Sequence, residues 1–206
     1  MRSGIVRVSG LLMMICAMIE IGGCGAEGSY AADDGALPAA YVAGQRGVLR
    51  VREDGARGRT WVLAIDGVRV HDIAKKKLIR RVQLPDWDVA NLACDPDMVL
   101  DGSGSAIVSS NVRLKLWRID AETFALQERD ITLREREQWD VGFGALMLAA
   151  DGNLLGLTST GGWLWKIDLA TGNAYLWNWG APILNVCDLM RTDTEIRCGP
   201  EEARLC

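Results

Sequence analysis

Carboxylates gather between residues 95 and 101, where three of seven residues are aspartate. Oxygen ligands at this density can hold a calcium ion. The spacing of Asp95, Asp97 and Asp101 matches no calcium loop, because Val99 stands where an EF-hand loop needs an oxygen ligand. We therefore predict a surface turn here, with a calcium site as the weaker alternative.

His71 is the only histidine, so a catalytic triad or a histidine-rich metal site would have to be built around it alone. The sequence holds no G-x-S-x-G, no H-E-x-x-H and no glycine-lysine phosphate loop. We expect His71 to be a half-buried strand residue. The sequence therefore predicts no catalytic residue and no cofactor.

Eight tryptophans are an unusual number for 206 residues. Exposed tryptophans form aromatic platforms for ligands, whereas tryptophans at repeated positions fill the space between neighbouring units. We expect Trp117 and Trp165 to be packing residues. Trp163, Trp177 and Trp179 are the predicted binding surface.

The first residues are typical of an export signal. Arg2 and Arg7 precede an apolar run over residues 8–19, which is too short to span a bilayer and ends at Glu20. Ile21-Gly22-Gly23-Cys24 then resembles the box of a bacterial lipoprotein, which implies a lipid on Cys24. Ordinary signal cleavage near residues 29–31, which would discard Cys24, is the alternative.

The remaining cysteines also fit an oxidising compartment. Four are left once the signal and the lipidated residue are set aside, and three pairings of them are open. We expect Cys187–Cys198 to staple a local hairpin and Cys94–Cys206 to close the chain end onto the body. A zinc site is disfavoured, because no C-x-x-C pair is present.

A repeat organises the rest of the chain. Asp72, Asp120 and Asp168 recur at intervals of 48 residues, and an Asp-Gly pair precedes each of them. Each unit shows four short segments of alternating apolar residues, which is typical of strands joined by tight turns. We expect the three aspartates to cap turns through backbone N–H groups, rather than to form a ring of ligands. The basic run of Lys75, Lys76, Lys77, Arg80 and Arg81 is predicted to be a solvated turn and an edge strand.

The repeat supports a family resemblance. Leu164-Trp165-Lys166-Ile167-Asp168-Leu169-Ala170-Thr171-Gly172 resembles the repeat of pyrroloquinoline-quinone-type β-propellers, and less closely that of YVTN-type propellers. Leu116-Trp117-Arg118-Ile119-Asp120-Ala121-Glu122-Thr123 resembles the same segment, with Phe124 in place of the glycine. The resemblance implies an all-β fold of propeller-like, antiparallel four-stranded repeats. It does not carry over the quinone cofactor, whose dedicated ligands are not recognisable here.

The predicted organisation is a signal over residues 1–23, a linker over 24–40 and a repeat domain over 41–206. Its units span about 41–85, 87–133, 139–179 and a partial 179–206. Known propellers close with four to eight blades. Three blades and part of a fourth therefore predict an open arc, a half-ring completed by a second copy, or a remnant of a longer protein.

The function that these features favour is a non-enzymatic binding or scaffold module of the cell envelope, with a protein as its partner. We expect it to be held by its lipid at the outer membrane, or to be secreted. The net charge of −4 disfavours nucleic acid as a ligand. An enzyme or a cofactor- or metal-binding protein, with its site at the ring mouth of an oligomer, is the alternative.

Overall fold

The computed structural model describes residues 47–134, 141–177, 182–183, 186–191, 196–198 and 204–205. The chain divides into two units, Met1–Asp33 and Asp34–Cys206, and every described residue belongs to the second. The predicted signal, the linker, Cys24, Trp179 and Cys206 lie outside the described residues. Within the described part of the chain, no helix is long and apolar enough to cross a membrane.

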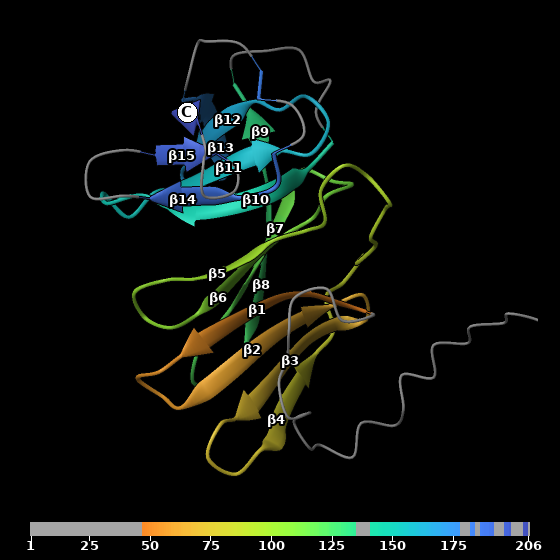
Figure 1. Cartoon of the computed structure of the whole chain (residues 1–206), viewed down its shortest axis with the longest axis vertical. Coiled ribbons are helices and arrows are strands. Elements are labelled where there is room, and N and C mark those ends of the chain that lie inside the picture. The colour runs from red at the N-terminus through yellow and green to blue at the C-terminus, as the bar shows by residue number, and fades with distance from the viewer. Residues whose placement is uncertain are drawn as a thin grey trace, which may run out of the picture. The chain divides into compact units, whose positions relative to one another are not determined.

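Every regular element described is a β-strand (Figure 1). The first sheet has the order β1 (Val48–Asp54), β2 (Arg59–Ala64), β3 (Gly67–Asp72) and β4 (Lys77–Val82). The second has the order β5 (Met98–Leu100), β6 (Ala106–Ser109), β7 (Lys115–Ile119) and β8 (Leu126–Asp130). Neighbouring strands of both sheets are antiparallel, as expected for strands joined by short hairpins.

The third sheet repeats this pattern and gains a fifth strand. It contains β10 (Phe143–Leu148), β11 (Leu154–Thr158), β12 (Leu164–Ile167) and β13 (Asn173–Leu176), with β9 (Thr132–Leu133) parallel to β13 at the outer edge. A smaller fourth sheet contains β14 (Leu189–Arg191), β15 (Ile196–Cys198) and β16 (Arg204–Leu205). The fold is therefore all-β and propeller-like, with three four-stranded antiparallel repeats and a partial fourth, as predicted.

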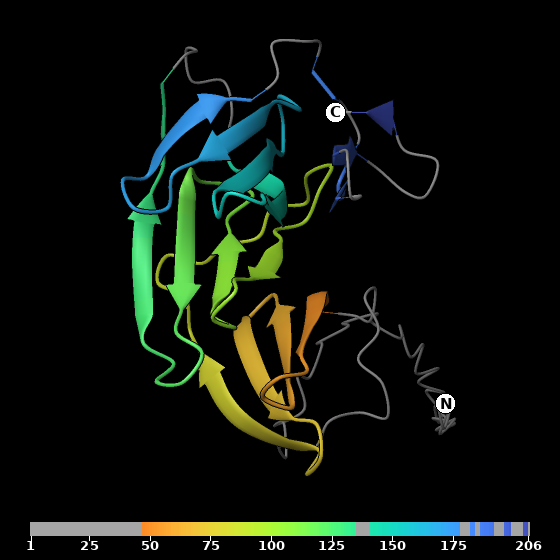
Figure 2. The ribbon, with the colours of Figure 1, turned by 90° about the vertical axis from the view of Figure 1, so that its left-hand side faces the viewer.

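Apolar side chains from consecutive sheets share the cores between them. The first core joins the first two sheets and contains Trp61 and Trp117, and the second joins the second and third sheets around Trp165. All three indole rings are fully buried, so packing is confirmed as the role of Trp117 and Trp165. Figure 2 shows the first sheet in orange and yellow, the second in green and the third in cyan to blue.

The turn between the third and fourth strands of each unit has a residue of positive φ at the same position. Lys76, Phe124 and Gly172 each follow the repeated aspartate by four residues, and all three adopt left-handed φ values of 52°, 57° and 76°. Only glycine accepts this region without steric cost. A Cβ at position 172 would also lie 2.5 Å from the carbonyl oxygen of Asp130, so the third turn has two reasons to hold glycine.

One disulfide joins Cys94, in the connection before β5, to Cys187, just before β14. The predicted Cys187–Cys198 and Cys94–Cys206 pairing is therefore wrong. The physical reason is register: Cys198 lies opposite Leu189 in the β14–β15 hairpin, so Cys187 precedes the paired residues. Its Cα instead lies 5.2 Å from that of Cys94. Gly144 permits this, because a Cβ there would overlap the side chain of Cys94.

Candidate functional site

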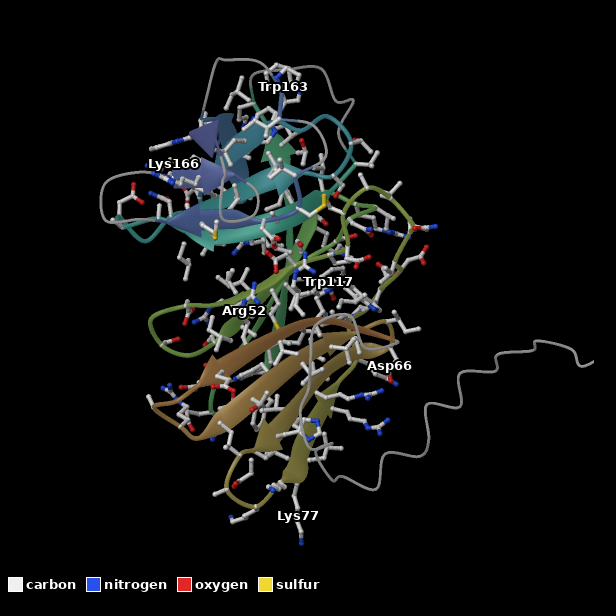
Figure 3. All side chains as sticks on the ribbon, in the orientation of Figure 1. Arg52, Asp66, Lys77, Trp117, Trp163 and Lys166 are labelled. Atoms are coloured by element: carbon white, nitrogen blue, oxygen red, sulfur yellow. A yellow bond between two sulfur atoms is a disulfide. The ribbon has the colours of Figure 1, made fainter. Side chains whose placement is uncertain are left out.

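The first strands of successive sheets lie side by side, with β1 next to β5, β5 next to β10 and β10 next to β14. A groove of about 380 Å³, open to solvent, runs over these four strands. Its lining residues are Arg52, Glu53, Val99, Leu100, Leu146, Met147, Leu148 and Leu189. Six of the eight lining residues are apolar, two of which (Leu146 and Met147) are buried in the cores, and the two charged side chains both come from β1. Figure 3 labels Arg52 between the first and second sheets.

The buried carboxylate of Asp97 forms hydrogen bonds with the strands that line the groove. One oxygen of Asp97, Oδ1, accepts hydrogen bonds from Arg50 Nε at 3.0 Å, from an Arg52 Nη at 3.1 Å and from the Met98 N–H at 2.7 Å. Its other oxygen, Oδ2, accepts the N–H of Leu146 at 2.8 Å. Burial raises the pKa of Asp97, and the charges of Arg52 and Arg50 oppose that rise. A single side chain therefore connects the first strands of three blades.

The prediction of a surface turn is wrong for Asp97, whose side chain is only 3 % exposed. The three aspartates do not share a site: Asp95 is exposed, and Asp101 accepts hydrogen bonds from Arg118 at 2.8 Å and from Ser103. Among the described residues, no three His, Cys, Asp or Glu side chains are placed to hold a metal ion.

His71 is fully buried rather than half-buried. It lies on β3 opposite Thr60 of β2, in the first sheet, and it does not line the groove. His71 is therefore a buried residue of the first sheet and is not part of the groove.

Two of the three tryptophans predicted as a binding surface, Trp163 and Trp177, are described, and neither lines the groove. Trp163 is half-buried, and its backbone N–H donates to the hydroxyl of Thr158 at 2.9 Å. Trp177 is 44 % exposed and follows Tyr175, which is 47 % exposed. The ammonium of Lys166 lies 5.4 Å from the centre of the Trp177 ring. Trp163 directly precedes β12, which is the middle strand of the third sheet and contains Lys166, and Trp177 directly follows β13, which contains Tyr175.

The repeated aspartates cap turns, as predicted. Asp72 accepts the N–H of Lys75 at 2.8 Å, Asp120 that of Thr123 at 2.8 Å, and Asp168 that of Ala170 at 2.8 Å. Hydrogen bonds lower the pKa of all three carboxyls: the backbone bonds given above are the largest cause for Asp72 and Asp120, whereas for Asp168 the hydroxyl of Thr171 has the largest effect and the N–H of Ala170 the next. The basic run is an exposed turn followed by β4, the outer edge strand of the first sheet; Lys77 is labelled in Figure 3.

Sequence reasoning missed the groove residues, although a signal for them is present. All of them except Leu189 stand shortly before an Asp-Gly turn of the repeat. Arg52 and Glu53 precede Asp54-Gly55, Val99 and Leu100 precede Asp101-Gly102, and Leu146 to Leu148 precede Asp151-Gly152. The strand that ends at this turn is the first strand of each of the three full blades, and these first strands contact one another. Taken together, these positions predict the lining of a common surface.

No family model matches the sequence, and no curated protein matches it. Solved structures of similar fold include a virginiamycin B lyase from Staphylococcus aureus, with a TM-score of 0.56 and 11 % identity over 78 % of this chain and 54 % of that one. The extracellular domain of a hybrid two component system from B. thetaiotaomicron has a TM-score of 0.52 and 14 % identity, over 74 % of this chain and 20 % of that one. A protein of unknown function from Bacteroides caccae has a TM-score of 0.52 and 14 % identity, over 81 % of this chain and 61 % of that one.

At these identities the likeness shows the fold alone. The chain spans about a fifth of the length of that extracellular domain and about half of the lyase. The fold class is therefore that of a β-propeller, present here as a run of three blades and part of a fourth.

Proposed function

We propose that this chain is an exported, non-enzymatic binding module of the cell envelope, which holds a segment of a partner protein in the groove over β1, β5, β10 and β14. The single observation that supports this most is the groove itself. Its volume of about 380 Å³ falls within the usual range for ligand sites, and it combines an apolar lining with two charged side chains.

The rigid floor of the groove supports the same proposal. The carboxylate of Asp97 fixes β1, β5 and β10 relative to one another, and the Cys94–Cys187 disulfide fixes the segment that leads to Leu189. A preformed surface loses less conformational entropy on binding than a mobile one. The apolar lining is therefore already ordered before a partner arrives.

Export is supported by three observations of different kinds. The signal-like residues precede the fold, the disulfide is of the kind that persists in oxidising compartments, and one solved structure of similar fold is described as an extracellular domain. We propose that Cys24 carries a lipid that holds the protein at the outer membrane. The lipid is then its only contact with the membrane.

Site-specific photocrosslinking tests the binding proposal. A photoreactive residue at Leu148, inside the groove, should crosslink to a partner protein in the producing cell, whereas the same residue at exposed Ala170 should not. The added substitution Val99→Glu should remove the product at position 148. Equal products from both positions, or none from position 148, would refute the groove as the binding site.

Self-association stays a further part of the proposal, with one restriction from the structure. Val62 and His71, which alternate with the first core's residues on β2 and β3, are fully buried within a single copy. A second copy is therefore expected to approach through the third and fourth sheets. Light scattering on oxidised residues 25–206 measures whether it does: a stable dimer supports closure by two copies, and a monomer excludes it.

A further inference from the structure

Arg52 presents unused hydrogen-bond donors at the wall of the groove. A guanidinium carries five N–H donors. Arg52 gives one to the carbonyl of Val51 at 3.0 Å and one to Asp97 at 3.1 Å. Its side chain lines the groove and remains 37 % exposed, and the other donors have no hydrogen-bond partner among the described residues. Arg50, by contrast, is 16 % exposed and donates to Asp97, Leu49 and Cys187.

The charges beneath the groove leave Arg52 partly uncompensated. Arg50 and Arg52 both point at the single carboxylate of Asp97. Glu53 also lines the groove, but it is exposed and forms no ion pair with Arg52. An anion that enters the groove thus meets a preordered guanidinium, with a solvated carboxylate at the rim as its only opposing charge among the described lining residues.

The other lining residues indicate what chemical groups should lie beside the anion. The other lining residues are apolar. Leu146 and Met147 are buried in the cores, and the partly exposed ones are Val99 and Leu100 on β5, Leu148 on β10 and Leu189 on β14. A ligand that matches both parts carries apolar side chains directly beside a carboxylate. The carboxyl terminus of a protein that ends in apolar residues has this chemistry.

We infer that the groove binds the apolar carboxyl-terminal segment of a partner protein, with its terminal carboxylate on the guanidinium of Arg52. The inference rests on the proposed binding function and names the chemistry of its partner. A peptide end fits better than a fatty acid, because the groove is open and its volume of about 380 Å³ suits two or three side chains, not an enclosed acyl chain.

Two fluorescent peptides of one sequence, Gly-Ser-Gly-Leu-Val-Leu, test the inference by anisotropy. One has a free carboxyl terminus and the other an amide. The oxidised full-length protein should bind the acid at least about tenfold more tightly than the amide, as expected for a charge-assisted hydrogen bond. Arg52→Met should reduce binding of the acid to the level of the amide and leave the amide unchanged. Arg52→Lys should retain part of the difference, and Arg113→Met, at an exposed loop position, should retain all of it.

Glu53→Gln provides an independent arm that leaves the Asp97 cluster intact. Removal of the opposing charge should tighten binding of the acid by a few-fold and leave binding of the amide unchanged. This arm keeps the test valid if Arg52→Met fails to fold. Fold integrity is checked from the urea midpoint of each variant.

The outcomes separate the inference from the proposed function. Equal binding of acid and amide, with both lost in Val99→Glu, would overturn carboxylate recognition and leave the binding groove standing. Binding of dodecanoate in preference to the acid peptide would overturn the protein partner in favour of a fatty acid. A crosslink at position 148 with no binding of either peptide would overturn the inference alone, and absence of both would overturn the proposed function as well.

Discussion

The carboxylate of Asp97 accepts the backbone N–H of Leu146 at 2.8 Å, across 49 residues of sequence. The bond joins the start of the second blade to the first strand of the third. Because the same carboxylate also holds Arg50 and Arg52 of the first blade, the alignment of three blades depends on one buried side chain.

Asp97→Asn should therefore lower the free energy of unfolding by about 3 to 5 kcal/mol at pH 7, the usual cost of removing one partner from a buried ion pair. The amide leaves two guanidinium groups facing a neutral side chain. Asp95→Asn, two residues earlier and exposed, should change it by less than about 0.5 kcal/mol. Urea unfolding measures both. Similar values for the two variants would contradict the role assigned to Asp97.

The disulfide should contribute about 2 to 4 kcal/mol to the free energy of unfolding, because it closes a loop with a sequence separation of 93 residues. The double variant Cys94→Ala, Cys187→Ala should unfold at a correspondingly lower urea concentration than the oxidised protein. Peptide mapping without reductant should recover a fragment that links Cys94 to Cys187. Recovery of Cys187 bound to Cys198 would restore the pairing expected from the sequence.

Lys76→Gly should stabilise the protein by about 0.5 to 1 kcal/mol. Lys76 is exposed and adopts a φ of 52°, a conformation that costs a side-chain-bearing residue more than glycine. Lys75→Gly is the matched control, because it removes the same charge at a residue without a positive φ, and it should destabilise. The Tm of each variant, measured in a thermal melt, tests whether the two substitutions have opposite effects on stability. Shifts of the same sign would show that charge, and not backbone strain, dominates this turn.

Acid should weaken the third sheet through Asp151. Its hydrogen bond from Lys166 at 2.6 Å, with help from Asn153, lowers the pKa of Asp151 from 3.8 to about 2. Because the folded-state pKa is the lower one, this pair stabilises the fold above pH 4 and loses its effect as the pH falls towards 2. Asp151→Asn should flatten the dependence of Tm on pH in this window, and Lys166→Met should raise the pKa of Asp151 measured by NMR. An unchanged pH dependence in Asp151→Asn would contradict the pair.

Cys24 should be the lipidated residue. In a bacterial host, labelled palmitate should enter the wild-type protein and the control Cys16→Ser, but not Cys24→Ser. A mature protein that begins near residues 29–31 in the wild type would instead establish ordinary signal cleavage and a secreted product.

Much of the fold could be predicted from local sequence, because a propeller blade is built from hairpins between residues close in the chain. The repeated Asp-Gly pairs and the alternation around Trp165 predict strands and turns, and the structure has them. The left-handed conformation of the fourth residue after each repeated aspartate was harder to predict. Phe124 occupies the left-handed conformation that Gly172 takes in the next unit, and its ring packs 6.0 Å from that of Trp61. Tertiary packing there outweighs the local preference for glycine.

The candidate site was less accessible to sequence reasoning, because its parts come from different blades. Asp97 lies in a segment whose composition is typical of a surface turn, and its burial depends on Arg50 and Arg52, more than 40 residues earlier. The disulfide was mispaired for the same reason, since Cys94 and Cys187 meet only once the blades are stacked. The spacing of residues within one blade does not predict either contact.

Strand β9 has a consequence for how the chain can be divided. It follows β8 directly in sequence, yet it pairs with β13, where Thr132 donates its N–H to Gly172 at 2.9 Å and Arg134 donates to Ala174 at 3.0 Å. A cut between Arg134 and Val141 would therefore leave the first fragment carrying an edge strand that belongs to the sheet of the second. Two such fragments, expressed separately, are expected to recognise each other through that exchanged strand, which makes this junction the natural place to split the protein into complementing halves.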